Sequence, residues 1–367
     1  MRRAVAFLVA CLAVAVAQAA SYRVETVASG LEHPWSLAFL PDGRMLVTER
    51  PGRLRLIEPG SDGRLGLRAE PVGGLPPVLA SGQAGLFDVV ADPDFATNNR
   101  VLLSFAHGTL EANHLRVVRA RLERDRLTDV QPVFTSRPAK TDAQHFGGRM
   151  AWLPDGSVLI GMGDGNLERT DAQRLNTHLG KILRFNPDGT LPSNNPFLSR
   201  PGALPEIYTS GHRNPQGIVV VNGQVYSHEH GARGGDELNR IRPGANYGWP
   251  LTTGGIDYTY ARITPFRELP GIEPPWVEWT PSIAPAGLAW YDAALFPAWR
   301  QSFLVAALRE GSVRVVPIRN GVPGPQEILF RELGERLRDV RVGPDGAIYL
   351  LTDSPNGRVL RVVPATP

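Results

Sequence analysis

The chain has 367 residues and a formal net charge of +3, with 39 Lys and Arg residues against 36 Asp and Glu residues. This basic excess is small and scattered, so it does not indicate a nucleic-acid-binding protein. The 39 glycines and 33 prolines are typical of a turn-rich fold, as many short strands require.

The N-terminus has the pattern of a secretory signal peptide. A positive start, Met1-Arg2-Arg3, precedes an apolar run from Ala4 to Ala17 and the small-x-small ending Ala17-Gln18-Ala19. The run is too short and too rich in alanine to predict a membrane span. We therefore expect residues 1–20 to be removed on export, which predicts a periplasmic or secreted protein whose residues 21–367 form one domain.

The single cysteine, Cys11, lies inside this segment. Its context, Leu8-Val9-Ala10-Cys11, resembles a lipoprotein cleavage box and leaves lipidation open as an alternative. Cleavage after Ala19 or Ala20 would leave a chain without disulfides, a cysteine-ligated metal or a cysteine nucleophile.

Past this segment, the chain reads as short antiparallel strands. Residues 22–27 alternate like a strand, and a strand–turn–strand unit follows around Pro41-Asp42-Gly43. The unit recurs around Pro154-Asp155-Gly156 and around Pro344-Asp345-Gly346. In such turns Pro presets φ, Asp caps the turn and Gly takes the positive φ, so they carry fold information and no chemistry.

Weaker copies of the unit complete a regular repeat. Copies begin near residues 38, 87, 150, 218, 288 and 341, roughly 50 to 70 residues apart. Internal repeats of this size predict an all-β fold, a six-bladed β-propeller with four-stranded antiparallel blades. The N-terminal strand would complete the last blade and close the ring. We expect one helix near Thr170 to His178, and long loops at 58–82, 186–205 and 252–275 that gather on one face around the site.

A hairpin with polar groups crowded at its ends lies near the middle of the chain. Residues 218–221 and 224–226 form its strands around the turn Asn222-Gly223. Gly211-His212-Arg213-Asn214 precedes it, and Ser227-His228-Glu229-His230-Gly231 follows it. Ordered polar groups at strand ends are where β folds keep their sites.

Six motifs in register carry a family resemblance that runs from about Val27 to Val363. They are Gln83-Ala84-Gly85-Leu86, Gln144-His145-Phe146-Gly147-Gly148-Arg149, Gly211-His212-Arg213-Asn214-Pro215-Gln216-Gly217, Asp236-Glu237-Leu238-Asn239, Asn246-Tyr247-Gly248-Trp249-Pro250 and Arg336-Leu337-Arg338-Asp339-Val340. Together they resemble the soluble pyrroloquinoline-quinone (PQQ) sugar dehydrogenases, most closely the aldose sugar dehydrogenase branch, or glucose/sorbosone dehydrogenases. That family is a six-bladed propeller, in agreement with the repeat count.

The resemblance implies a cofactor site. PQQ carries three carboxylates, and arginine supplies planar, bidentate donors to such groups. By position, the clamp consists of Arg213, Asn214, Arg309, Arg336 and Arg338, with His230 beside the cofactor; the family usually has Lys in place of Arg309. A Ca²⁺ ion would bind the backbone carbonyls of Gly231 and Ala232.

The resemblance also assigns catalytic roles. His145 would be the general base that removes the C1 hydroxyl proton of an aldose as hydride leaves. Asp164 would orient His145, and Arg213 would polarise the quinone oxygen that gains charge. Gln83 and Gln144 would face the sugar. Residue type alone favours a structural loop histidine at His145 and a solvated strand face at Arg336 and Arg338.

Two other readings remain open. Ca²⁺-dependent lactonases are also six-bladed propellers, although they surround a central metal with carboxylates and Asn, whereas this chain offers a set of arginines. A non-catalytic binding propeller is the other alternative, because a fold does not determine a function. For a dehydrogenase, the absence of a haem Cys-x-x-Cys-His motif predicts that electrons pass to a separate acceptor. The sequence indicates neither the preferred sugar nor the oligomeric state.

Overall fold

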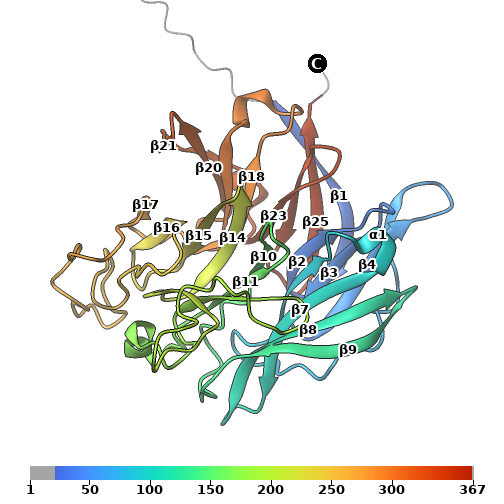
Figure 1. The fold of residues 1–367 in the computed structure, drawn as a ribbon. Coiled ribbons are helices and arrows are strands. Elements are labelled where there is room, and N and C mark those ends of the chain that lie inside the picture. The colour runs from blue at the N-terminus through green and yellow to red at the C-terminus, as the bar shows by residue number, and fades with distance from the viewer. Residues whose placement is uncertain (1–20, 366–367) are drawn as a thin grey trace, which may run out of the picture.

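Each repeat of the sequence forms one antiparallel sheet, and six sheets surround a common axis as the blades of a β-propeller (Figure 1). The computed structural model describes residues 21–365, so the expected signal peptide lies outside the described residues. Blade 1 consists of β2 (Pro34–Phe39), β3 (Met45–Glu49), β4 (Arg53–Pro59) and β5 (Leu65–Leu67). Blade 2 consists of β6 (Leu86–Ala91), β7 (Arg100–Gly108), β8 (Asn113–Glu123) and β9 (Arg126–Thr135). Blade 3 consists of β10 (Met150–Trp152), β11 (Val158–Met162), β12 (Lys181–Phe185) and β13 (Ile207–Ser210).

The second half of the ring follows the same order. Blade 4 consists of β14 (Pro215–Val221), β15 (Gln224–Glu229), β16 (Asp236–Ile241) and β17 (Val277–Trp279). Blade 5 consists of β18 (Pro285–Tyr291), β19 (Ser302–Ala307) and β20 (Ser312–Arg319), and both β21 (Val322–Pro323) and β22 (Glu327–Leu329) pair with β20. Blade 6 consists of β23 (Leu337–Val342), β24 (Ile348–Thr352), β25 (Gly357–Pro364) and β1 (Tyr22–Leu31). The six-bladed propeller is therefore confirmed, with one fifth strand in blade 5.

The N-terminal strand closes the ring, as the sequence predicts. Strand β1 pairs antiparallel with β25, from Tyr22 opposite Pro364 to Leu31 opposite Gly357. In Figure 1 the blue β1 lies beside the red β25. The last blade is thus built from both ends of the chain.

The Pro-Asp-Gly turns adopt the geometry expected of them. In the first, Gly43 has φ 85° and donates to the Leu40 carbonyl at 3.0 Å, while Asp42 Oδ1 accepts from the Arg44 N–H at 3.1 Å. The other two turns repeat both bonds. These local contacts explain why the strand positions could be read from the sequence.

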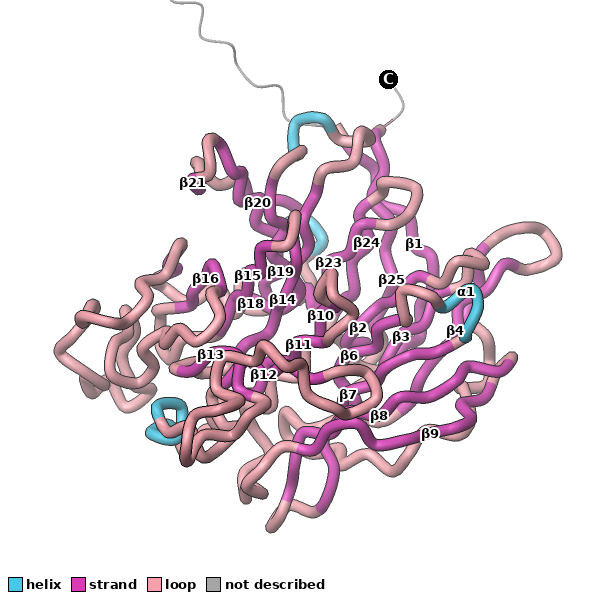
Figure 2. The backbone as a smooth tube through the Cα atoms, viewed as in Figure 1, coloured by secondary structure: helices cyan, strands magenta, loops and turns pink. Residues whose placement is uncertain are grey.

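The helix expected at Thr170 to His178 is mostly absent. Only a 3₁₀ helix, Arg169–Gln173, forms there. The other described helices, α1 (Phe95–Asn98), Pro297–Trp299 and Arg331–Leu333, are shorter still (Figure 2). The reason is a buried lysine: Lys181 Nζ donates to the carbonyls of Asp171 and Ala172 at 2.8 and 3.0 Å. Those carbonyls would otherwise accept the next helical hydrogen bonds.

Between residues 21 and 365 the core consists of seven apolar clusters, six of which each fill one gap between neighbouring blades. The gap between blades 1 and 2, for example, holds Leu46, Leu56, Leu103 and Phe105, all fully buried. Every blade therefore buries both faces, and the first strands of successive blades contact one another around the axis.

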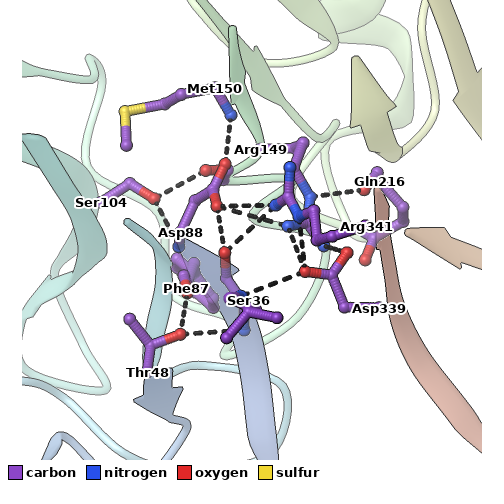
Figure 3. Close-up of polar contacts among 12 residues, drawn as sticks. Ser36, Thr48, Phe87, Asp88, Ser104, Arg149, Met150, Gln216, Asp339 and Arg341 are labelled. Atoms are coloured by element: carbon purple, nitrogen blue, oxygen red, sulfur yellow. Dashed lines mark hydrogen bonds and ion pairs between the residues drawn. The ribbon is translucent and has the colours of Figure 1, made fainter. Parts of the chain in front are cut away.

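Charged side chains form a network where inner strands of four blades meet (Figure 3). Arg149 Nη1 and Nη2 lie 3.3 Å from Asp88 and from Asp339 respectively, and Arg341 approaches Asp339 at 2.9 Å and Asp88 at 3.3 Å. Ser36 donates to Asp88 at 2.5 Å. These residues come from blades 1, 2, 3 and 6, so the network joins blades that are distant in the sequence.

Candidate active site

His145 lies at the head of a buried hydrogen-bonded chain. Its Nδ1 is 2.7 Å from Oδ1 of Asp164, whose Oδ2 accepts a 2.7 Å hydrogen bond from Nε1 of Trp249. The backbone N–H of Asn166 also donates to Asp164 Oδ1, at 2.8 Å. Both carboxylate oxygens are therefore fixed, and they orient the imidazole with Nε2 pointing away from Asp164.

The backbone of His145 is held in an unusual conformation. Its φ is 48°, in the left-handed region that only a few residues other than glycine adopt. Its N–H donates to Oε1 of Gln83 at 3.0 Å, across the gap between two blades. Its carbonyl oxygen packs on Gly163, where an added Cβ would lie 2.2 Å away. Contacts from neighbouring segments thus impose the position of the imidazole.

The electrostatics of the pair suit a base. Burial lowers the pKa of His145 below its ordinary value, although the hydrogen bond with Asp164 opposes this shift. Burial acts to raise the pKa of Asp164, but the hydrogen bond with His145 and the charge of Arg213 outweigh burial, so this pKa lies below its usual value. Near neutral pH the pair is a neutral imidazole beside a carboxylate, the state that accepts a proton.

A narrow crevice opens at His145. Arg213, Trp249 and Tyr258 line it, and it leaves about 20 Å³ free. Tyr258 is 63% exposed, with its ring 5.9 Å from the guanidinium of Arg213. It comes from loop 252–275, the only one of the three long loops predicted from sequence that lines this crevice.

A larger cavity of about 210 Å³ adjoins the crevice. His145 and Arg213 line the crevice, and the residues that follow them in the chain, Phe146 and Asn214, line the cavity. Its lining combines aromatic rings with cations, as a planar polyanion requires. The aromatic rings are Trp35, Phe87 and Phe146, and the arginines are Arg50, Arg336 and Arg338.

Arg336 and Arg338 lie together in this cavity, as their spacing on one strand face predicts. Both donate to Oδ2 of Asp353, at 3.1 Å each. Burial acts to raise the pKa of Asp353, but the charges of the two arginines lower it to about 2. Nε of Arg338 is buried without a partner among the described residues. A buried, unpaired N–H beside excess positive charge fits an anionic ligand.

Asn214 and His230 also line the cavity, as expected. Asn214 Oδ1 accepts from the Gly147 N–H at 3.1 Å, which ties the two walls together. His230 Nε2 is 2.7 Å from the carbonyl of Pro285, and burial lowers the pKa of His230 to about 4. His230 is thus neutral at physiological pH and adds no charge to the cavity.

The expected calcium ligands lie at the junction of crevice and cavity. Arg213 Nη1 donates to the carbonyl of Gly231 at 2.5 Å, and Ala232 lines the crevice. An added Cβ on Gly231 would lie 2.2 Å from the Gly234 carbonyl, so the chain folds tightly there. The carbonyl of Gly231 already contacts a cationic group, which is consistent with a cation-binding oxygen.

Two residues of the expected site lie elsewhere. Arg309 is exposed and donates to the Ser282 carbonyl at 3.4 Å, and it lines a neighbouring cavity with Trp279. Gln144 is half-buried and lines neither the crevice nor the larger cavity. The structure therefore does not bring these two side chains together with His145.

Sequence reasoning assigned no role to Trp249, Asp353, Arg50 or Tyr258. Trp249 stood in a motif, Asn246 to Pro250, without a function. Asp353 ends the strand pattern Ile348 to Asp353. A carboxylate at the end of a buried strand is the one signal in the sequence that could have pointed to this residue.

Comparison with known proteins identifies the family. The sequence pattern that defines the glucose/sorbosone dehydrogenases matches residues 31–361. The chain belongs to this family. The resemblance read from the six motifs is thereby confirmed.

Several similar proteins are named as sugar dehydrogenases. Aldose sugar dehydrogenase YliI of Escherichia coli is 40% identical over 363 residues, 96% of each chain. The apo crystal structure of the soluble E. coli aldose sugar dehydrogenase aligns with a TM-score of 0.89 at 38% identity, over 94% of this chain and all of the other. The PQQ-bound aldose sugar dehydrogenase of Streptomyces coelicolor aligns with a TM-score of 0.75 at 29% identity, over 94% and 99%.

Two further observations bear on the alternatives. Between residues 21 and 365, no three or more His, Cys, Asp or Glu side chains are arranged to hold a metal ion. The axis, where a lactonase-type propeller would need a central metal, carries the guanidinium groups of Arg149 and Arg341.

None of the helices described between residues 21 and 365 has the length and hydropathy of a membrane span.

Proposed function

We propose that this protein is a PQQ-dependent aldose sugar dehydrogenase that oxidises the C1 hydroxyl of an aldose to a lactone and passes the electrons to an external acceptor. One observation carries the proposal: the His145–Asp164–Trp249 chain lies directly beside a cavity of aromatic rings and arginines. A base next to an anion site suits this reaction better than a hydrolase or a binding module. The family membership and the PQQ-bound relative support it.

The residues divide the work between the two spaces. The larger cavity, with Arg336 and Arg338 in its lining, would hold PQQ, and the bound cofactor would supply the acceptor for the hydride from C1. Nε2 of His145 takes the hydroxyl proton as the C1 carbonyl forms, and Asp164 stabilises the resulting imidazolium. Arg213, buried between crevice and cavity, is the cation placed to favour negative charge developing on the cofactor.

Ca²⁺ is part of the proposal. The carbonyls of Gly231 and Ala232 would hold it, and hard oxygen ligands of this kind suffice when the cofactor itself supplies charge. Arg213 already donates to the Gly231 carbonyl, so a bound ion would share this oxygen with the guanidinium or displace it. Displacement would free Arg213 to face the cofactor.

Export completes the proposal. The signal-peptide pattern of residues 1–20 supports export to the periplasm or out of the cell. Sugar and electron acceptor would therefore meet the enzyme outside the cytoplasm.

The test uses purified protein lacking residues 1–20. We expect dye reduction by aldoses only when both PQQ and Ca²⁺ are added, with lactone as the product. Sugar-independent hydrolysis of a lactone, or the absence of any turnover although PQQ binds, would contradict the proposed activity.

A further inference from the structure

One arginine of the cofactor cavity has no side-chain partner in the part of the chain that the structure describes. Arg50 follows β3 at the β3–β4 turn, and no hydrogen bond or ion pair engages its side chain among residues 21–365. The other arginines of this hairpin are committed: Arg53 to Glu49 at 2.7 Å and Arg55 to Glu49 at 3.4 Å. The guanidinium of Arg50 is therefore available to a ligand.

The backbone fixes where that guanidinium starts. The N–H of Arg50 donates to the His33 carbonyl, and its carbonyl accepts from the Leu86 N–H, both at 3.0 Å. An added Cβ on Gly85 would lie 2.2 Å from the Arg50 oxygen, so blade 2 packs directly on this residue. Both neighbouring segments hold Arg50 at the rim of the cavity.

The charge balance of the cavity calls for an anion. Arg50, Arg336 and Arg338 line it, against one carboxylate, Asp353. Three positive charges and one negative charge leave an excess of two. Asp353 already pairs with Arg336 and Arg338, so Arg50 gains nothing from it. Like charges gathered in one cavity are unfavourable unless a ligand neutralises them.

We infer that Arg50 is a cofactor-binding residue, whose guanidinium holds a carboxylate of PQQ from the side of blade 1. The inference rests on the proposed function and adds a residue that no motif of the sequence singled out. Arg50 also lines a second, outer cavity of about 310 Å³ with His33 and Ser81, so it forms the wall between the cofactor and that side of the protein.

The experiment measures PQQ binding rather than turnover. Apo-protein in Ca²⁺ buffer is titrated with PQQ, and the absorbance of bound PQQ gives Kd. For Arg50→Gln we expect Kd to rise about ten- to a hundredfold, the usual contribution of a charge-assisted hydrogen bond. At saturating PQQ the KM for the sugar stays unchanged, because Arg50 does not line the crevice at His145. Arg50→Lys keeps the charge but not the planar fork, so a smaller rise of roughly three- to tenfold is expected.

Arg64→Gln is the matched control. Arg64 belongs to the same blade, its side chain is 90% exposed, and it lines no cavity of the site, so its Kd should equal that of the wild type. A Kd within twofold of the wild type for Arg50→Gln, or a changed sugar KM at unchanged PQQ Kd, would overturn the inference. If Arg50→Gln does not fold, an unchanged Kd for Arg50→Lys has the same meaning. A wild type that fails to bind PQQ would instead refute the proposed function.

Discussion

At the scale of single residues, the proposed chemistry depends on which nitrogen of His145 carries the proton. Asp164 accepts at 2.7 Å from Nδ1, so the proton resides on Nδ1 and Nε2 keeps its lone pair. A histidine without this partner would divide its population between two tautomers. The hydrogen bond therefore selects the form that can take a proton from the sugar.

Replacing His145 tests this role directly. His145→Ala should still bind PQQ, because the arginines lie in the adjoining cavity, but kcat should fall by about 10² to 10⁴. The pKa of His145 lies below its ordinary value, so wild-type activity should be lost only as pH falls through a midpoint below about 6.5. That acidic limb should vanish in the variant. Near-normal turnover with an unchanged pH profile would show that the base is another group.

Trp249 tests the next link of the chain. Trp249→Phe removes the indole donor to Asp164 but keeps an aromatic ring beside Arg213. We expect kcat to fall about tenfold, the lower end of what a hydrogen bond to a charged group contributes, with PQQ Kd and sugar KM unchanged. Trp152→Phe, which removes an indole bond to the Ala91 carbonyl far from the site, is the control and should leave kcat unaltered.

At the scale of elements, the inner strands are joined by the ion-pair network of the axis. Removing one partner of a buried ion pair is costly because it leaves an uncompensated charge. Asp88 is fully buried and contacts Arg149, Arg341 and Ser36. The network therefore makes the relative positions of blades 1, 2, 3 and 6 depend on one carboxylate.

Asp88→Asn should lower the free energy of unfolding by about 3–5 kcal/mol, measured as a shift of the urea midpoint. Asp62→Asn removes a carboxylate from an exposed pair, 3.9 Å from Arg64, and should change stability by less than about 1 kcal/mol. Equal effects of the two substitutions would mean that the axial network does not hold the blades together.

Local signals explain how much of these elements the sequence could predict. Strand alternation and the Pro-Asp-Gly turns act over a few residues, so the six blades and the hairpin at Asn222 were predicted correctly. The prediction of a helix near Thr170 was wrong because Lys181 donates hydrogen bonds to backbone carbonyls of that segment. No local sequence pattern reveals this contact. The pairing of His145 with Asp164 came from the family resemblance, not from periodicity.

The remaining site residues depend on ring closure. Arg50 comes from blade 1, Asp353 from blade 6, and Trp249 from the segment that follows the third strand of blade 4. These residues approach the site only when the ring forms. The direction of a side chain is equally non-local: Arg309 has the expected place in the chain, yet it points toward a neighbouring cavity. Only the assembled structure determines these contacts.

At the scale of the whole molecule, the ring is closed by hydrogen bonds, packing and an ion pair between Glu25 of β1 and Arg361 of β25. The two ends of the described chain meet, since the Ala365 N–H donates to the Ser21 carbonyl at 3.0 Å. Tyr22 packs its ring against Phe330, 4.9 Å away, and Leu31 is fully buried. Loss of β1 would therefore expose apolar surface and the free edge of β25.

Two rearranged chains separate connectivity from pairing. Deleting residues 21–31 should give a protein that aggregates and fails to bind PQQ, because an open propeller cannot hold residues of blades 1 and 6 on one cavity. A circular permutant should behave differently. It joins Ala365 to Ser21 through a short Gly-rich turn and opens the chain at Gly63, an exposed turn in blade 1.

In that permutant β25 and β1 become an ordinary hairpin, while every strand pair is kept. Permutation is tolerated where the termini are adjacent and the new opening lies in an exposed turn. We therefore expect wild-type PQQ affinity and a urea midpoint close to that of the parent. A permutant that is soluble and folded by circular dichroism, yet binds PQQ poorly, would contradict this expectation. It would show that the site requires β1 to be the N-terminal strand, and not only to pair with β25.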